Sequence, residues 1–283
     1  EMGIIDSKWA KSPRPQAVQP WSEVPAEEKE RFDHLMAVYA ATVFRMDQAV
    51  GDLVAGLKQR GVFENTLILF MSDNGGNAEA GPKGRTEGDP TKADSNWFCG
   101  ESWAFPQNTP FRLFKHYNHE GGIATPLIAH WPAGIRAGQG RLEHSPAHLI
   151  DIMPTLVEVA GAAYPSEFNG QAIQPMEGVS LKPLLAAETP VPLASRDLYW
   201  EHEGNAAMRE GDWKLVRKGR NAPWELYDLK ADRTELHDLA ATQPEKAAEL
   251  TAKWQAWAER AHVVPYPGEG EAKTKGKGKK KAK

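Results

Sequence analysis

The chain has 283 residues, of which 41% are hydrophobic and 25% charged, a composition that excludes a fibrous protein and one disordered throughout. No run of about 18 apolar residues is present, so we expect no membrane span. The formal net charge of −4 includes seven lysines in residues 273–283, so the body of the chain is more acidic than the total suggests.

The N-terminal quarter of the chain predicts an arm, a long helix and a strand. Residues 1–26 contain four prolines and no sustained period, which indicates an extended arm. Over residues 27–60, apolar side chains recur every three or four positions, which predicts an amphipathic helix that ends at Gly61 and packs one face on a core. Residues 66–71 are almost wholly apolar, which is typical of a strand buried on both faces of a parallel sheet.

This strand runs into the polar turn Ser72-Asp73-Asn74-Gly75-Gly76. In open α/β sheets, ligands are commonly held at the carboxyl ends of strands. The Asp73 carboxylate and the Asn74 amide oxygen are ligands that Ca²⁺ or Mg²⁺ prefers. The same residues also suit an ordinary turn, because Asn and Gly tolerate positive φ. Two ligands do not complete a metal site, so others must come from elsewhere.

The middle of the chain continues an α/β alternation. Residues 77–110 are rich in Gly, Pro, Asp and Asn without a clear period, which predicts a long functional loop. Residues 123–131 are predicted to form a strand and residues 145–160 a helix.

A lysine and two histidines precede this second strand. A fixed Lys115 ammonium close to a divalent cation would bind a tetrahedral anion and stabilise charge on its oxygens. The alternative is a solvated surface charge, as most lysines are. His119 is a candidate for lining the same pocket, and His116 is a weaker one.

After the prolines at positions 190 and 192, the pattern changes to short strands followed by a helix. The helix begins near Pro244. The four strands are predicted at residues 198–200, 206–209, 213–217 and 224–228. These elements predict a small antiparallel sheet that carries one helix. His202 lies among polar residues between the first two strands, either as a substrate contact or in an ordinary hairpin turn.

Several of these motifs occur together, and in the same order, in one known family. The chain resembles the second half of a sulfatase of the arylsulfatase type, over residues 37–261. Each motif alone is weak, and the identification depends on their order. They are Leu69-Phe70-Met71-Ser72-Asp73-Asn74-Gly75, Lys115 five residues before Glu120-Gly121-Gly122, Trp131-Pro132, Asp151-Ile152-Met153-Pro154-Thr155-Leu156, Glu177-Gly178-Val179-Ser180-Leu181, Gly211-Asp212-Trp213-Lys214-Leu215 and Glu225-Leu226-Tyr227-Asp228-Leu229.

The resemblance implies an α/β, alkaline-phosphatase-like fold, a mixed sheet flanked by helices that is incomplete in this chain. Residues 1–26 would be the arm, and residues 27–190 the C-terminal part of the catalytic domain. Residues 191–267 would form a small C-terminal subdomain of an antiparallel sheet plus a helix. Residues 268–283 are predicted to be a disordered lysine- and glycine-rich tail, solubilising rather than nucleic-acid binding.

The resemblance also implies a chemistry. In sulfatases, a cysteine in a C-x-P-x-R motif becomes formylglycine, whose hydrated form attacks sulfur while Ca²⁺ and basic side chains hold the sulfate oxygens. By position, Asp73 and Asn74 would be metal ligands for Ca²⁺ or Mg²⁺, and Lys115 would contact the sulfate and the leaving oxygen. His119 and His202 are carried as substrate-contact candidates. The substrate would be a sulfated small molecule or glycan, and the family suggests a periplasmic or secreted protein.

The chain departs from the family at the nucleophile. Cys99 is the single cysteine, with no proline two residues later and no arginine four residues later, so it is not the formylglycine precursor. An internal disulfide is excluded as well. We therefore expect a sulfatase fragment that is inactive by itself. Two alternatives stay open: a phosphoester or phosphonate hydrolase of the same superfamily, and a non-catalytic binding protein that retains the scaffold.

Overall fold

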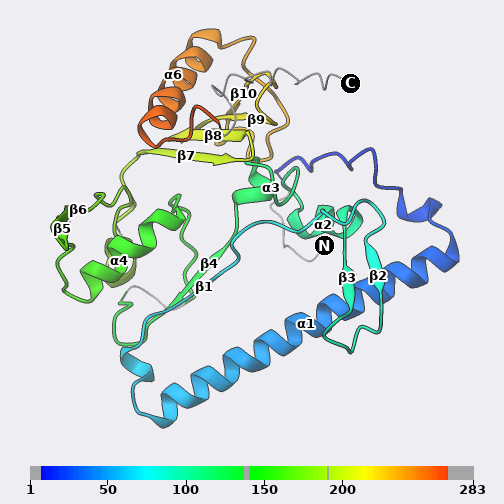
Figure 1. Cartoon of the computed structure of the whole chain (residues 1–283), viewed down its shortest axis with the longest axis horizontal. Coiled ribbons are helices and arrows are strands. Elements are labelled where there is room, and N and C mark those ends of the chain that lie inside the picture. Colours follow the sequence, from blue (N-terminus) through cyan, green and yellow to red (C-terminus); the bar gives the residue numbers. More distant parts are fainter. Residues whose placement is uncertain (1–7, 137–139, 190, 267–283) are drawn as a thin grey trace, which may run out of the picture.

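The computed structural model describes residues 8–136, 140–189 and 191–266, so the predicted tail of residues 268–283 lies outside the described residues. A two-stranded sheet occupies the middle of the molecule in Figure 1, between a long N-terminal helix and a C-terminal four-stranded sheet. The architecture is mixed α/β with a small antiparallel sheet and helix, as the sequence predicts.

The central sheet pairs β1 (Ile68–Met71) with β4 (Leu127–His130). The two strands are confirmed, but the expectation of a parallel sheet buried on both faces is wrong in the described residues. β1 and β4 run antiparallel, with Ile68 opposite His130, and Phe70 is 40% exposed. An apolar run indicates that a strand can be buried, but it does not identify the partner strand or its direction. The strand predicted for residues 123–131 starts later, at Leu127, because Ile123 is the last residue of the short helix α3 (Glu120–Ile123).

The long helix α1 (Ala26–Gln59) confirms the helix predicted for residues 27–60. Its buried side chains are Phe32 and Leu35, which form a small core with Val24. Most of the remaining apolar stripe is exposed, so the predicted packing of a whole face holds only near the start of the helix. Tyr39, Val43, Met46 and Leu53 are 39–58% exposed, whereas Val50 and Leu57 are half-buried. No described helix has the length and apolarity that crossing a membrane requires.

The predicted loop of residues 77–110 contains regular structure that the sequence did not reveal. Elements of two to eight residues are too short to establish a period. The helix predicted for residues 145–160 begins later, because residues 145–148 are irregular. The N-terminal arm contains η1 (Trp21–Glu23). The other elements that precede the C-terminal sheet are η2 (Phe63–Asn65), β2 (Arg85–Glu87), β3 (Asn96–Phe98), α2 (Glu101–Asn108), η3 (Leu149–Asp151), α4 (Ile152–Val159), β5 (Glu167–Phe168), β6 (Gln171–Ala172) and α5 (Lys182–Ala186).

The C-terminal sheet and its helix agree with the prediction. The strands pair antiparallel in the order β10-β9-β8-β7, and α6 (Pro244–Arg260) covers the sheet (Figure 1). Leu250 and Trp254 of the helix are buried against Met208 and Leu215. The strands are β7 (Asp197–His202), β8 (Asn205–Glu210), β9 (Trp213–Arg217) and β10 (Glu225–Asp228).

Candidate active site

Backbone hydrogen bonds hold the polar turn after β1 against the segment that contains α3. The Gly75 nitrogen donates to the Gly122 carbonyl at 3.0 Å, and the Gly76 nitrogen donates to Asn108 Oδ1 at 2.9 Å. A Cβ atom on Gly75 would lie 1.8 Å from the Gly121 oxygen. Glycine is therefore required at position 75 for the turn to approach the backbone of Gly121 this closely.

The same turn is bonded to the loop that carries the predicted lysine. The backbone nitrogen of Lys115 donates to the Gly76 carbonyl at 3.0 Å. One cavity of about 630 Å³ is lined by Asp73, Asn74 and Lys115, with Tyr39 of α1 on its wall. The structure thus brings together the three residues that the sequence predicted for metal and sulfate binding.

The oxygen atoms of the turn suit a hard divalent cation. The Asn74 side-chain nitrogen donates to the Gly75 carbonyl at 2.8 Å, which leaves the amide oxygen free to face a ligand. Ser72 Oγ donates to the Asn74 carbonyl at 2.8 Å and supports the same loop conformation. Among the described residues, no hydrogen bond to the Asp73 carboxylate is found. A carboxylate and an amide oxygen from consecutive residues that line one cavity fit part of a Ca²⁺ or Mg²⁺ ligand set.

The Lys115 ammonium is paired with an exposed carboxylate. Its Nζ lies 3.0 Å from a Glu79 carboxylate oxygen, and the two side chains are 32% and 55% exposed. The hydrogen bond from Lys115 lowers the pKa of Glu79 below its ordinary value. An anion that enters the cavity would compete with Glu79 for this ammonium.

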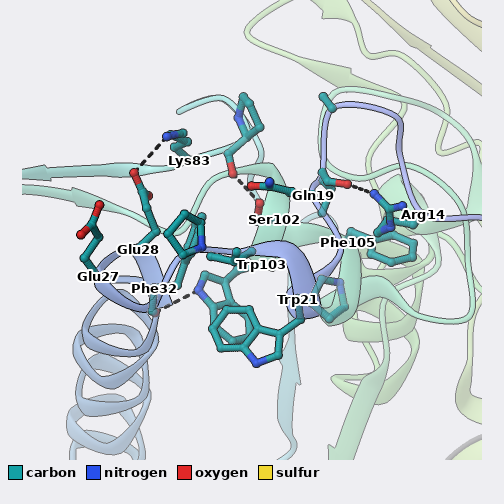
Figure 2. A pocket seen from close by; sticks show the side chains of 16 residues that line it. Arg14, Gln19, Trp21, Glu27, Glu28, Phe32, Lys83, Ser102, Trp103 and Phe105 are labelled. Carbon is teal, nitrogen blue, oxygen red and sulfur yellow. Dashed lines mark hydrogen bonds and ion pairs between the residues drawn. The ribbon is translucent and has the colours of Figure 1, made fainter. Parts of the chain in front are cut away.

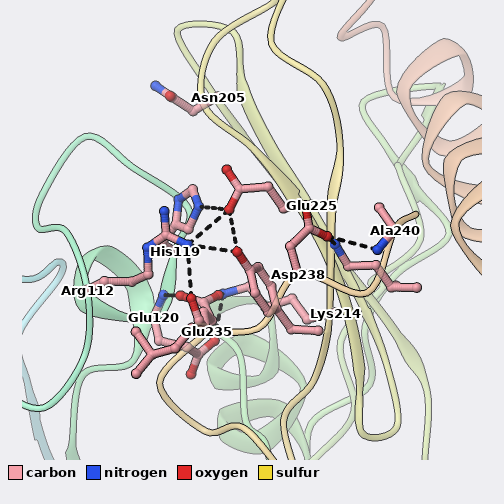
Figure 3. Close-up of polar contacts among 12 residues, drawn as sticks. Arg112, His119, Glu120, Asn205, Lys214, Glu225, Glu235, Asp238 and Ala240 are labelled. Carbon is pink, nitrogen blue, oxygen red and sulfur yellow. Dashed lines mark hydrogen bonds and ion pairs between the residues drawn. The ribbon is translucent and has the colours of Figure 1, made fainter. Parts of the chain in front are cut away.

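His119 lies beside the site but does not line it. Its side chain is fully buried, and Nε2 lies 3.2 Å from a Glu225 carboxylate oxygen (Figure 3). The ring therefore has no exposed atom with which to touch a substrate in this arrangement. Arg112 Nη1 donates to the same Glu225 oxygen at 3.0 Å and to Tyr227 Oη at 2.7 Å. These contacts fix the segment around Lys115 on the C-terminal sheet.

A second set of buried charges joins α3 to this sheet. Lys214 has no exposed surface and lies 2.6 Å from a Glu120 oxygen and 2.7 Å from a Glu235 oxygen. The Glu120 nitrogen also donates to Glu235 at 2.8 Å, and Arg233 pairs with the Glu120 carboxylate. This network was not predicted from the sequence, and its one signal there is Lys214, a charged residue between the apolar Trp213 and Leu215.

Acid should weaken the contacts that Glu225 makes with His119 and Arg112. Burial alone would raise the pKa of Glu225, but His119, Tyr227 and Arg112 outweigh burial and lower it to about 2 from an ordinary 4.5. The unfolded chain therefore binds more protons below pH 4.5, so stability is full above that pH and falls as pH drops toward 2. Urea unfolding at several pH values measures how the free energy of unfolding depends on pH. Glu225→Gln should make this dependence shallower. A slope identical in both proteins would contradict the assignment.

His202 lies elsewhere on the surface. It ends β7, and its ring meets that of His116 at a centroid separation of 5.2 Å. His202 is absent from the lining of the cavity that holds Asp73 and Lys115. Its predicted role as a substrate contact stays a prediction.

A larger cavity, of about 730 Å³, lies between the N-terminal arm, the start of α1 and α2. Figure 2 shows Trp21, Trp103 and Phe105 on its wall, with the Trp103 ring nitrogen donating to the Phe32 carbonyl at 3.1 Å. None of the residues predicted for catalysis or metal binding lines this cavity.

Comparison with known structures identifies the class of the fold. A putative sulfatase from Bacteroides thetaiotaomicron, 20% identical, matches with a TM-score of 0.55 over 91% of this chain and 53% of that one. The crystal structure of Ps i-CgsB, 25% identical, matches with a TM-score of 0.57 over 78% of this chain and 42% of that one. The fold is therefore the alkaline-phosphatase-like α/β fold of sulfatase structures.

The sequence comparisons make the assignment specific. A model of the sulfatase family matches residues 9–162, and one described as N-sulphoglucosamine sulphohydrolase, C-terminal, matches residues 111–260. An uncharacterised sulfatase of Schizosaccharomyces pombe is 32% identical over 88% of this chain and 48% of its own length. A sulfatase of Formosa agariphila is 30% identical over 83% of this chain and 44% of its own. The chain belongs to the sulfatase family, and it spans about half the length of these curated relatives.

Proposed function

We propose that this chain is part of a sulfate-ester hydrolase of the arylsulfatase type, and that it supplies the cavity for the sulfate group. The observation that supports this function most directly is the convergence of Asp73, Asn74 and Lys115 on one cavity. An arylsulfatase of Klebsiella aerogenes is 30% identical over 59% of the chain, which agrees with this class of reaction.

Each residue of the cavity has a distinct task in this proposal. Asp73 and Asn74 would hold a Ca²⁺ or Mg²⁺ ion together with ligands from outside this set. The bound ion would act as a Lewis acid toward a sulfate oxygen. The Lys115 ammonium would neutralise charge on the sulfate and on the leaving oxygen. His119 would act as a positioning residue that keeps this segment on Glu225.

The nucleophile is a separate part of the proposal. A formylglycine made from a C-x-P-x-R cysteine would have to come from outside this sequence, because Cys99 does not lie in that motif. A periplasmic or secreted location follows from the family resemblance and stays a prediction.

We propose a sulfated sugar or a sulfated small molecule as the substrate. Ps i-CgsB is described in complex with k-i-k-neocarrahexaose. The structure of BT4656 is described in complex with its substrate, D-glucosamine-2-N,6-O-disulfate. A phosphonate monoester hydrolase from Silicibacter pomeroyi, 20% identical, shares the fold at a TM-score of 0.50. The sulfatase family match favours a sulfate ester over that alternative.

Binding and activity assays test whether this chain binds sulfate without supplying the nucleophile. The purified chain, with added Ca²⁺, should bind sulfate in calorimetry but show no turnover of 4-nitrophenyl sulfate. Metal-dependent turnover would contradict the role given to the missing motif. Failure to bind sulfate, combined with binding of a phosphonate, would favour the second class of hydrolase.

The ion pair between Lys115 and Glu79 provides a graded test. Glu79→Gln should tighten sulfate binding by about 1.4- to fivefold, because a partly exposed ion pair contributes about 0.2–1 kcal/mol. Glu64→Gln, an exposed glutamate outside the cavity, is the matched control and should leave the affinity unchanged. Equal affinities in both variants and the native chain would show that Lys115 does not bind the anion.

A further inference from the structure

A second cluster of metal-ligand side chains lies outside the sulfate cavity. His116, His202 and Glu203 offer two ring nitrogens and a carboxylate oxygen, all within 4.8 Å of one another. Imidazole is a ligand for zinc, copper and nickel, unlike the all-oxygen pair Asp73 and Asn74. We propose that these three side chains bind a divalent transition metal ion of the zinc type.

The spacing of the ligand atoms fits such an ion. His116 Nε2 lies 3.3 Å from a Glu203 carboxylate oxygen. Two ligands about 2.1 Å from a tetrahedral Zn²⁺ ion are themselves about 3.4 Å apart. The third ligand is close as well, because a ring nitrogen of His202 lies within 4.8 Å of both other ligand atoms. The His116 and His202 rings meet edge to face, at a centroid separation of 5.2 Å. An ion bound here would replace the direct contact between His116 and Glu203 with a bond to each side chain.

A buried amide holds the two histidine segments together. The Asn205 side-chain nitrogen donates to the His116 carbonyl and to the His202 carbonyl, both at 3.0 Å. Its oxygen accepts from the Gly219 nitrogen at 3.0 Å, and Asn205 is 3% exposed. Figure 3 shows Asn205 near the end of the C-terminal sheet. The backbone beneath the ligands is therefore fixed by protein contacts alone, as in a preorganised site.

The backbone at His116 belongs to a β-turn. The Tyr117 nitrogen donates to the Phe114 carbonyl at 3.2 Å, which makes His116 the third residue of that turn. Its φ of 93° suits this position, because a type II turn has a positive φ there. Glu203 also lies on a turn, the two-residue connection between β7 and β8. Two of the three proposed ligands, His116 and Glu203, therefore lie on tight turns.

The cluster is open to solvent. The side chains of His116 and Glu203 are 37% and 64% exposed, so an ion can reach them and keep a fourth position for water or another ligand. None of the three side chains lines the sulfate cavity. The inference therefore does not depend on the proposed sulfatase activity.

A competition titration of Zn²⁺ against a chromogenic chelator tests the site. The native chain should bind one equivalent of Zn²⁺, and His202→Ala should lower the affinity for this ion by about tenfold or more. His237→Ala is the matched control, because His237 also faces a carboxylate, 3.5 Å away on Asp232, but has no second histidine in a cluster of the described residues. This control should keep the native affinity.

Two further variants make the outcome decisive. Glu203→Gln, on an exposed turn, should weaken Zn²⁺ binding with an unchanged circular dichroism spectrum. Asp73→Ala should keep the native Zn²⁺ affinity. The proposal is overturned if His202→Ala binds Zn²⁺ as tightly as the native chain, or if the loss appears in Asp73→Ala or His237→Ala instead.

Discussion

Lys115→Ala should weaken sulfate binding by about 10- to 100-fold in the presence of Ca²⁺, because a hydrogen bond to a charged group contributes about 1.5–3 kcal/mol. The backbone nitrogen of Lys115 donates to the Gly76 carbonyl, so the backbone conformation of the loop does not depend on the lysine side chain. In a longer protein that combines this chain with the C-x-P-x-R motif, the same change should lower the rate by about 10²-fold or more. Isothermal titration with sulfate measures the first effect, and turnover of 4-nitrophenyl sulfate measures the second.

The control for this prediction is Lys182→Ala. Lys182 pairs with Glu158 at 3.6 Å on the surface, with 41% of its side chain exposed, and it does not line the sulfate cavity. Both variants remove one positive charge, so they separate a local contact from a change in net charge. Equal sulfate affinities for Lys115→Ala and the native chain would contradict the role of the ammonium.

Lys214→Met should lower the free energy of unfolding by about 3–5 kcal/mol, because it leaves a buried carboxylate without its cation. Methionine has a similar length, so little packing is lost. Glu120 keeps Arg233 as a partner, whereas Glu235, which has no exposed side-chain surface, loses the ammonium 2.7 Å away. Denaturant unfolding followed by tryptophan fluorescence gives the measurement.

A second substitution identifies the cause of this destabilisation. Adding Glu235→Gln to Lys214→Met should restore part of the lost stability, because the buried charge is then removed on both sides. Lys182→Met, in an exposed pair, should cost at most about 1 kcal/mol. If the double variant were as unstable as Lys214→Met alone, the loss would come from packing instead of charge.

The sequence predicted the elements whose patterns are local. The period of residues 27–60 identified α1, and the succession of short strands after the prolines at positions 190 and 192 identified β7 to β10. The sequence could not predict which part of the apolar stripe of α1 is buried, because that depends on neighbours. Nor did the apolar run of residues 67–71 reveal that its partner, β4, runs antiparallel.

In the candidate site as well, residues in short motifs could be predicted, whereas contacts between distant parts of the chain could not. Asp73, Asn74 and Lys115 were found because each belongs to a short motif, and they line one cavity. His119 was expected to face the pocket because it precedes Glu120. Its actual partner, Glu225, is 106 residues away in the chain, a contact that only the fold creates. The cluster of His116, His202 and Glu203 was not recognised as a unit for the same reason.

Binding of Tb³⁺, which takes the same oxygen ligands as Ca²⁺ and luminesces when a nearby aromatic ring absorbs light, tests the central claim most directly. Tyr39 on the cavity wall is the expected sensitiser. Addition of Tb³⁺ should give a saturable signal that Ca²⁺ displaces and that Asp73→Ala and Asn74→Ala abolish. Asp52→Ala, which removes an exposed carboxylate of α1, should keep it. A signal unchanged by Asp73→Ala and Asn74→Ala would show that the cation does not bind at the end of β1.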